Sequence, residues 1–326
     1  MFVGGHSEQK IRRFFVSALD NKSEESLKNI FGLLNIYKPV GMTSHDVIAV
    51  LRRVTKIKQI GHTGTLDPFA EGVLPVCIGK ATRLIEYFAD DKEYLATVQF
   101  GSATTTYDIE GEKTFKSDRK ITASEIDLTP FKGEIEQLPP IYSAIKVNGK
   151  KLYEYAREGK DVEIQPRKVV IEKIELKSFD ENLQQAEILI KCSKGTYIRS
   201  IAHDLGQNLG VGAHLVKLVR TQAGKFRVEN SVMLDGIDVS ANLINPLEIL
   251  DLPKIEVNED NLKKIKNGMA IENNLNCFTN VRNNATITSS HKLGEGWGEV
   301  CLVYNNIVAA IGLIDGNKIK VKKVFL

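Results

Sequence analysis

The hydrophobic and polar residues of this chain form patterns that predict short strands and helices in an irregular order. Residues 33–37 indicate a strand, and a helix is expected to begin at 43–46, after which apolar residues recur every three to four positions. The runs 94–100 and 186–192 alternate and predict two further strands, while 197–209 has helical spacing. Strands and helices interspersed without a repeating strand–helix–strand rhythm favour an α+β fold.

Changes in composition divide the chain into three parts. Residues 1–31 are a polar extension, to which we assign no chemistry. Residues 32–250 are dense in predicted elements, and Pro246 and Pro253 mark a linker near their end. Residues 251–326 carry a new set of short strands and are expected to form a small β-rich C-terminal domain.

Charge and residue counts narrow the possible functions. The net charge of +3 is mildly basic and permits a nucleic-acid partner without arguing for one. The four cysteines form no C-x-x-C pair and the six histidines have no ligand spacing, so no metal site is predicted. No apolar run is long enough for a signal peptide or a membrane span. We therefore expect a cytoplasmic protein, with a monomer as the default.

Two short motifs fail as nucleotide sites. Gly79-Lys80-Ala81-Thr82 lacks the first glycine of a phosphate loop and has alanine where the loop needs serine or threonine. The glycine pair at 210 and 212 has no third glycine and does not follow a strand. Neither a triphosphate nor a dinucleotide site is predicted.

The segment Gly61-His62-Thr63-Gly64-Thr65-Leu66-Asp67-Pro68 carries the candidate chemistry. Its two glycines in four residues permit tight turns and close approach of another backbone. By local pattern alone, Asp67 is typical of a helix N-cap and Pro68 of a first helical residue, which predicts a helix through Phe69 to Leu74.

Five ordered blocks between residues 32 and 230 give this segment a second interpretation. Residues 61–84 read GHTGTLDPFAEGVLPVCIGKATRL and closely resemble the signature of the TruB family, the bacterial tRNA pseudouridine-55 synthases. The likeness continues in the following blocks: KPVGMTS at 38–44, KEY at 92–94, PPIYSAIKVNGKKLYEYAREG at 139–159 and CSKGTYIRSIAHDLGQNL at 192–209. Five blocks in order are a specific signal.

The resemblance implies a role for individual residues. The family's essential aspartate corresponds to Asp67, its base-stacking tyrosine to Tyr94 and the arginine partner of the aspartate to Arg199. An apolar pocket residue corresponds to Leu218, and His62 matches the histidine beside the flipped nucleotide. The implied fold is the pseudouridine-synthase fold, with a central mixed, largely antiparallel sheet.

The implied reaction breaks the C1′–N1 bond of a uridine, rotates the uracil and rejoins it through C5, and it requires no cofactor. The base must leave its stack, and Tyr94 and Leu218 are expected to hold it. Asp67 would attack C1′ or C6, or deprotonate C2′, while Arg199 keeps it ionised and aimed. Arg220 is interpreted as a phosphate contact or a solvated charge.

Two regions are expected to hold the T-arm and T-loop of tRNA. Residues 141–168 carry seven basic against four acidic side chains, with tyrosines interleaved, a composition that suits looped RNA. In the resembling family this region is an RNA-binding thumb. Residues 251–326 stand where that family carries a PUA-like module, expected to grip the acceptor arm or merely to stabilise the protein.

Two other functions stay open at this point. The first is a guide-RNA-dependent pseudouridine synthase, against which the insertion at 142–159 argues. The second is a tRNA folding chaperone without catalysis, against which intact Asp67, Tyr94 and Arg199 argue.

Overall fold

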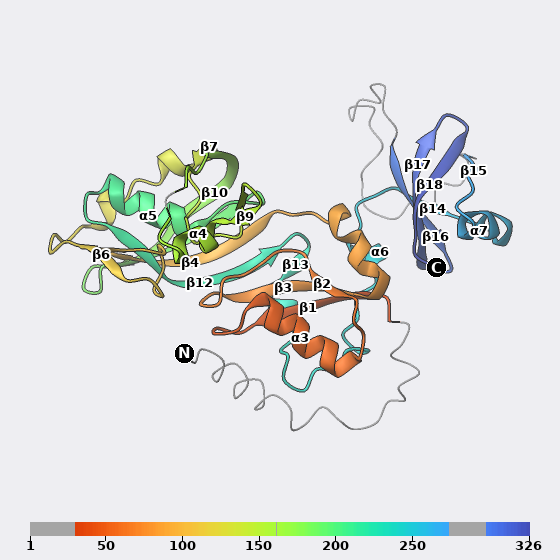
Figure 1. Ribbon diagram of the computed structural model, residues 1–326, viewed down its shortest axis with the longest axis horizontal. Helices are drawn as coiled ribbons and strands as arrows, with labels where there is room; N and C mark the ends of the chain where they lie inside the picture. The colour runs from red at the N-terminus through yellow and green to blue at the C-terminus, as the bar shows by residue number, and fades with distance from the viewer. Residues whose placement is uncertain (1–29, 161, 274–297) are drawn as a thin grey trace.

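The computed structural model describes residues 30–160, 162–273 and 298–326 (Figure 1). The predicted extension, residues 1–31, therefore lies almost entirely outside the described residues. The described parts form two main sheets with helices beside them.

A nine-stranded sheet forms the larger part of the molecule. Its strands pair antiparallel, except that β3 and β12 run parallel. The predicted α+β fold with a mixed, largely antiparallel sheet is confirmed. The strand order is β1 (Gly32–Lys38), β3 (Glu71–Ile78), β12 (Ala213–Ala223), β4 (Lys92–Phe100), β11 (Gln185–Cys192), β10 (Arg167–Asp180) and β7 (Gly133–Gln137), with β2 (Ile60–His62) on β3 and β13 (Phe226–Arg227) on β12.

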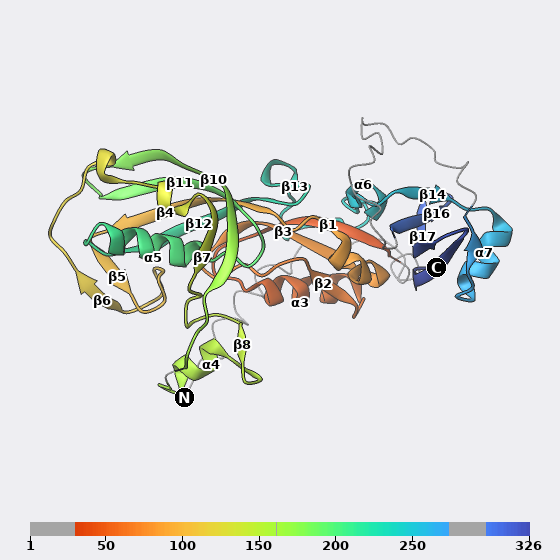
Figure 2. The ribbon, with the colours of Figure 1, turned by 90° about the horizontal axis from the view of Figure 1, so that it is seen from above.

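Two helices pack on this sheet where the apolar spacing predicts them. Helix α3 (Ser44–Thr55) begins at Thr43, whose hydroxyl accepts from the Asp46 amide at 3.0 Å, while Asp46 Oδ2 accepts from the Thr43 amide at 2.8 Å. Helix α5 (Ile198–Asn208) packs against β12 and β4. Both lie on the side of the sheet from which the segment with α4 projects (Figure 2). Within the described ranges, no helix is both long enough and apolar enough to cross a membrane.

The predicted helix from Asp67 to Leu74 is wrong. Only a short turn follows Asp67, and β3 begins at Glu71. The run EGVLPVCI is apolar at nearly every position and is buried from its second residue on, because β3 lies between neighbouring strands with both faces covered. Such a strand reads as a continuous apolar run, which periodicity alone does not separate from a buried helix.

The parallel junction of β3 and β12 is short and close. It joins two residue pairs, and at Gly72 the backbone has φ +105°. A Cβ at Gly72 would overlap the carbonyl oxygen of Arg220, so only glycine fits there. The loop that carries Asp67 joins β2 to β3 and therefore ends at this junction.

The turn-rich stretch after β4 and the predicted RNA-binding segment both contain small elements. The predicted RNA-binding segment, residues 141–168, projects from the sheet as a hairpin and a short helix, and its last two residues already belong to β10 (Figure 2). The elements of these regions are β5 (Ser102–Thr104), β6 (Lys113–Lys116), η2 (Ala123–Glu125), η3 (Thr129–Phe131), β8 (Lys146–Val147), β9 (Lys150–Lys151) and α4 (Leu152–Arg157).

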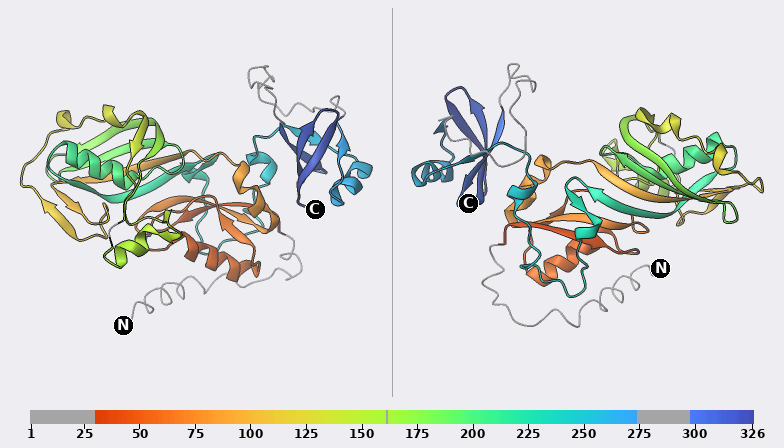
Figure 3. Two further views of the ribbon diagram at one scale, coloured as in Figure 1. Left: turned by 45° about the horizontal axis from the view of Figure 1, so that its top comes forward. Right: turned by 180° about the vertical axis from the view of Figure 1, so that it is seen from behind.

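A second, five-stranded sheet forms the predicted β-rich C-terminal domain. It packs on the first part through one apolar cluster that joins Leu33 and Val73 to Val308, Ile311 and Phe325 (Figure 3). The remaining elements are η1 (Gly79–Tyr87), η4 (Val228–Asn230), α6 (Pro246–Ile249), β14 (Lys254–Glu256), α7 (Glu259–Lys266), β15 (Ile271–Glu272), β16 (Glu299–Tyr304), β17 (Ile307–Asp315) and β18 (Lys318–Val324).

Replacing Gly72 by alanine should destabilise the protein strongly. Gly133→Ala is the matched control, because Gly133 also has a positive φ, +87°, but nothing lies within 4 Å of its Cβ position. Strain alone should cost about 1–3 kcal/mol in each variant, and the overlap with β12 should add at least ~2 kcal/mol at Gly72. Urea unfolding followed by circular dichroism measures the difference. Equal midpoints for the two variants would contradict the close approach of β3 and β12.

Candidate functional site

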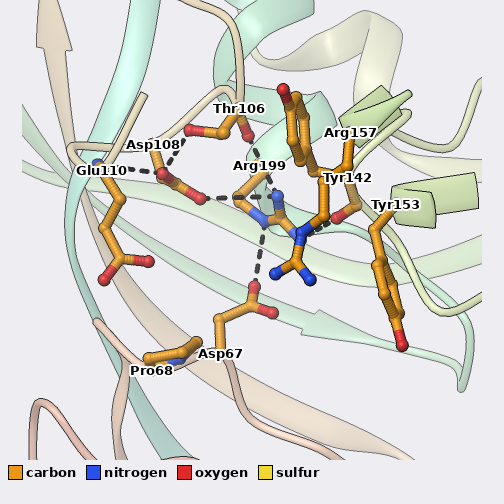
Figure 4. A pocket seen from close by; sticks show the side chains of 9 residues that line it. All are labelled: Asp67, Pro68, Thr106, Asp108, Glu110, Tyr142, Tyr153, Arg157 and Arg199. Carbon is orange, nitrogen blue, oxygen red and sulfur yellow. Dashed lines mark hydrogen bonds and ion pairs between the residues drawn. The ribbon is translucent and has the colours of Figure 1, made fainter. Parts of the chain in front are cut away.

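Asp67 lies on the loop that joins β2 to β3, and β3 forms the parallel junction with β12. The loop turns back immediately after it, with the Ala70 amide donating to the Asp67 carbonyl at 3.1 Å. The side chain of Asp67 is 36% exposed, so its carboxylate is open to a ligand. Figure 4 shows it projecting into a pocket.

Arg220 holds the backbone of this loop from inside the sheet. Its guanidinium donates to the carbonyl oxygens of Val73 at 2.6 Å, Gly64 at 3.1 Å and Thr65 at 3.3 Å. The residue is fully buried, so both interpretations from the sequence, phosphate contact and solvated charge, are wrong. A buried charge is costly unless it is hydrogen-bonded, and the three carbonyl oxygens provide hydrogen bonds for the Arg220 guanidinium.

Lys38 holds the other end of the same loop. Its ammonium donates to the carbonyl oxygens of Met42 at 2.7 Å, Pro39 at 2.9 Å and Pro68 at 3.4 Å, and the residue is fully buried. Burial lowers the pKa of Lys38 to about 8, against the opposing pull of the Asp67 carboxylate. Lys38 belongs to the block KPVGMTS, and nothing in that block alone indicated that its charge is internal.

Two further contacts fix the loop between these cations. The Ser44 hydroxyl accepts from the Leu66 amide at 2.8 Å and donates to the Leu66 carbonyl at 3.1 Å. The Gly41 amide donates to the Pro68 carbonyl at 2.8 Å. The residues on both sides of Asp67 are therefore tied to β1 and the start of α3.

Arg199 joins the Asp67 carboxylate to the opposite wall of the pocket. Its Nε lies 2.9 Å from Asp67 Oδ2 and its Nη1 3.4 Å from Asp108 Oδ2, as ion pairs. Its Nη1 and Nη2 also donate at 3.0 Å to the carbonyl oxygens of Thr106 and Tyr142. The side chain is only 6% exposed. The contact between Arg199 and Asp67 expected from the sequence is present.

Asp108 is a second carboxylate on Arg199 that the sequence did not indicate. It is buried, and it accepts from the Thr106 hydroxyl at 2.5 Å and from the Glu110 amide at 3.0 Å. Burial raises the pKa of Asp108, while Thr106 and Arg199 oppose the rise. It lies in the turn-rich stretch 101–118, where no periodicity or motif marks it.

A stacked ring pair supports the turn that carries Asp108. Tyr107 has a positive φ of +63°, an uncommon conformation for a bulky residue. Its ring stacks on that of His203 with centroids 3.8 Å apart and planes at 16°. Because His203 is on α5 one turn after Arg199, the stack ties the turn to the helix that positions the guanidinium.

These residues enclose a pocket of about 350 Å³. Three of its lining side chains, those of Tyr142, Tyr153 and Arg157, come from the predicted RNA-binding segment (Figure 4). The full lining is Asp67, Pro68, Thr106, Asp108, Glu110, Tyr142, Tyr153, Arg157 and Arg199.

The other three predicted site residues do not line this pocket. Tyr94 and Leu218, exposed by 7% and 5%, belong to the same buried cluster as Leu66, beside the Asp67 loop. His62 is half-buried on β2, and its Nδ1 has no hydrogen-bond partner in the part of the chain that the structure describes. Burial lowers the pKa of His62. The structure therefore brings Arg199 to Asp67 and places Tyr94 and Leu218 behind the loop.

The described residues offer no arrangement for a resident metal ion. Over the ranges 30–160, 162–273 and 298–326, no three His, Cys, Asp or Glu side chains are grouped to hold one. Cys77, Cys192 and Cys301 are free and buried, and Cys277 lies outside the described residues.

Comparisons with known proteins cover most of the chain. The model of the TruB family pseudouridylate synthase N-terminal domain matches residues 52–198, and that of the tRNA pseudouridylate synthase B C-terminal domain matches residues 199–247. The tRNA pseudouridine synthase B of Carboxydothermus hydrogenoformans is 42% identical over 302 residues, covering 90% of this chain and 98% of the relative. That of Staphylococcus haemolyticus is 48% identical over 255 residues, covering 73% and 84%.

Solved structures share the fold at lower identity. A chain from the "Crystal Structure of a Cbf5-Nop10-Gar1 Complex" is 25% identical with a TM-score of 0.64, covering 94% of this chain and 88% of that one. A chain from the "Structure of H/ACA RNP bound to a substrate RNA containing 2'-deoxyuridine" is 22% identical with the same TM-score of 0.64, covering 95% and 89%.

The buried charge of Lys38 should make stability depend on pH in the alkaline range. The folded-state pKa of about 8 lies below that of an exposed lysine, so between these values the unfolded chain binds more protons. The unfavourable contribution of the buried ammonium is complete below pH 8 and disappears as the pH rises. The free energy of unfolding, taken relative to Lys38→Met, should increase by about 1 kcal/mol per pH unit above pH 8. Exposed Lys132→Met is the control, and a pH-independent difference at Lys38 would contradict the burial argument.

Proposed function

This chain belongs to the TruB family of pseudouridine synthases, and from that membership we infer that it converts uridine 55 in the T-loop of tRNA to pseudouridine. The observation that supports this most directly is the Asp67 carboxylate, open to a pocket and ion-paired with the buried guanidinium of Arg199. We further propose that the protein acts in the cytoplasm as a monomer, with tRNA as its partner and without a resident cofactor.

The reaction makes an isomer of its substrate. The C1′–N1 bond breaks, a C1′–C5 bond forms, and the proton on C5 is exchanged for one on N1, so no electrons are gained or lost. The chain must therefore supply positioning, charge and proton transfer. Asp67 is proposed to supply the anion, attacking C1′ or C6 or deprotonating C2′.

The contacts around Arg199 suit that role. A planar guanidinium held by two carbonyl groups and by Asp108 has little freedom, so it fixes the direction of the Asp67 carboxylate. The backbone of the loop is fixed independently by Lys38 and Arg220. Preorganised charge of this kind is what lowers a barrier without rearrangement during the reaction.

The uracil must leave its stack to reach Asp67, which costs a few kcal/mol that the pocket must offset. We assign Tyr94 as the ring against which it stacks and Leu218 as the apolar contact on the other side. Since both are almost fully buried here, the base would reach them only by displacing what covers them. His62 is assigned to the position beside the extruded nucleotide.

The segment 141–168 is proposed as the RNA clamp. Arg157 lies 5.3 Å from the centre of the Tyr153 ring and Lys150 lies 4.9 Å from that of Tyr155, so positive charge and ring faces alternate on a projecting surface. Tyr153 and Arg157 also line the Asp67 pocket, which couples RNA contact to the site. The C-terminal domain is proposed as a PUA-like module for the acceptor arm, with basic side chains on α7, namely Lys263, Lys264 and Lys266.

The stand-alone activity is favoured over guide-RNA dependence by similarity. Relatives named tRNA pseudouridine synthase B are 41% to 49% identical to this chain, whereas the chain from the Cbf5-Nop10-Gar1 complex is 25% identical. A folding chaperone without catalysis is disfavoured because Asp67, Arg199 and Asp108 form a complete charge network.

Tritium release tests the proposal. The purified protein, without guide or cofactor, is incubated with a tRNA transcript carrying tritium at C5 of uridine. One equivalent should be released per tRNA, and none when the T-loop uridine is changed to cytidine. Tight tRNA binding without release would favour the guide-dependent or chaperone function.

Asp67→Asn should abolish turnover, because the amide keeps the shape of the side chain but carries no charge. Affinity for tRNA should stay within about tenfold of wild type, since the loss is confined to the chemical step. Single-turnover tritium release and filter binding measure the two effects. Asp118→Asn, at a side chain that is 95% exposed and outside the pocket lining, is the matched control and should keep the wild-type rate.

Arg199→Lys should lower the rate of the chemical step by about 100-fold or more. Lysine keeps the charge but cannot reach Asp67, Asp108 and two carbonyl groups at once. Arg227→Lys, exposed on β13 and outside the pocket lining, is the control. A rate within threefold of wild type for Arg199→Lys would argue that the planar guanidinium, with its several donors, is not needed for the chemical step.

A further inference from the structure

A buried glutamine holds the start of helix α5. Gln137 is the last residue of β7 and is only 3% exposed. Its Nε2 donates to the Tyr197 carbonyl at 3.0 Å, and its Oε1 accepts from the Tyr197 amide at 2.7 Å. Tyr197 is the N-cap residue of α5, and the amide at this position has no partner within a helix. Gln137 therefore binds both polar groups of this residue's backbone, as a neighbouring strand would.

Two further contacts reach the same turn of α5 from the residues that follow Gln137. The Ser200 hydroxyl, which is buried, donates to the Leu138 carbonyl at 2.9 Å. Arg199 Nη2 donates to the Tyr142 carbonyl at 3.0 Å. Residues 137–142, here called the connector, thus contact the first turn of α5 at three points, and this is the turn that carries Arg199.

The connector is stiff and lies at the base of the projecting segment 141–168. Pro139 and Pro140 are both buried, and proline fixes its own φ and restricts the residue before it. Gln137 pairs across the sheet with Arg167, so the projecting segment leaves and returns at this one pair of residues (Figure 2). A displacement of that segment is therefore carried by the connector to the start of α5.

We propose that Gln137 is a positioning residue, which sets where the Arg199 guanidinium lies against the Asp67 carboxylate. This role rests on the pseudouridine synthase activity proposed above. Gln137 does not line the pocket, so it acts through Arg199 and not on the substrate. The role requires a side chain that accepts one hydrogen bond and donates another, which a neutral amide does and neither a thioether nor a carboxylate does.

Gln137→Met tests the proposal at nearly unchanged side-chain volume. At saturating tRNA, single-turnover tritium release should be slower by at least about 10-fold, because small displacements of a positioning group strongly affect the chemical step. The Kd for tRNA from filter binding should stay within about threefold of wild type. Gln184→Met is the matched control, since the Gln184 amide makes the same pair of contacts with the backbone of Ile121, at 2.7 and 3.1 Å. It should keep the wild-type rate.

Gln137→Glu adds a readout that a general loss of stability would not produce. A neutral carboxylic acid accepts and donates as the amide does, whereas the ionised carboxylate only accepts. Burial favours the neutral form of the introduced group. The rate of Gln137→Glu relative to wild type should therefore rise at least about fivefold between about pH 8.5 and about pH 5.5. The same ratio for Gln184→Glu should not change with pH.

A double-mutant cycle shows whether Gln137 acts through Arg199. In the Arg199→Lys background, Gln137→Met should lower the rate by less than about twofold, because the guanidinium that it positions is already absent. The full loss in that background would overturn the proposal, and so would a wild-type rate for Gln137→Met.

Urea unfolding shows whether each variant is folded under the assay conditions. If Gln137→Met is not, the pH dependence of Gln137→Glu decides, and a constant ratio to wild type would overturn the proposal. If the wild-type protein itself forms no pseudouridine, the proposed function fails instead, which keeps the two failures distinct.

Discussion

The site depends on two buried cations that hold one loop by its carbonyl oxygens. Lys38 and Arg220 are fully buried, and their donors meet the backbone on both sides of Asp67. Removing a charge from water is costly, and here several carbonyl dipoles replace the lost hydration. The loop thus gains a defined shape without any regular secondary structure of its own.

This arrangement separates the fixing of the loop from the fixing of the carboxylate. Lys38 and Arg220 hold the backbone, while Arg199 approaches from α5 and holds the side chain of Asp67. Lys38 lies at the end of β1 and Arg220 on β12, whereas Arg199 lies on α5, which packs against β12 and β4. Because both sets hold one short loop and the Asp67 carboxylate also acts on the charge of Lys38, the energetic effects of changes in the two sets are expected to be non-additive.

The sequence predicted the regular elements well and the interior of the site poorly. The strand at 94–100 and the helix at 197–209 were identified because one face of each is buried, which makes apolar residues recur at strand or helix spacing in the sequence. The continuous apolar run of β3 carries no such period, which is why a helix was expected there. Arg220 and Asp108 could not be placed, because burial of a charged residue depends on partners far away in the chain. The resemblance to a family identified Asp67 and Arg199, which the structure brings into contact.

The contact between Arg220 and Gly64 joins residues 156 positions apart. Contacts between residues so far apart in sequence form slowly, because bringing the two ends of the intervening chain together costs entropy before the contact can stabilise the protein. During synthesis the Asp67 loop therefore leaves the ribosome well before the strand that shapes it. An incomplete chain carries the reactive carboxylate but lacks the geometry to use it, so competence to act on RNA arises only once nearly the whole large sheet has been made.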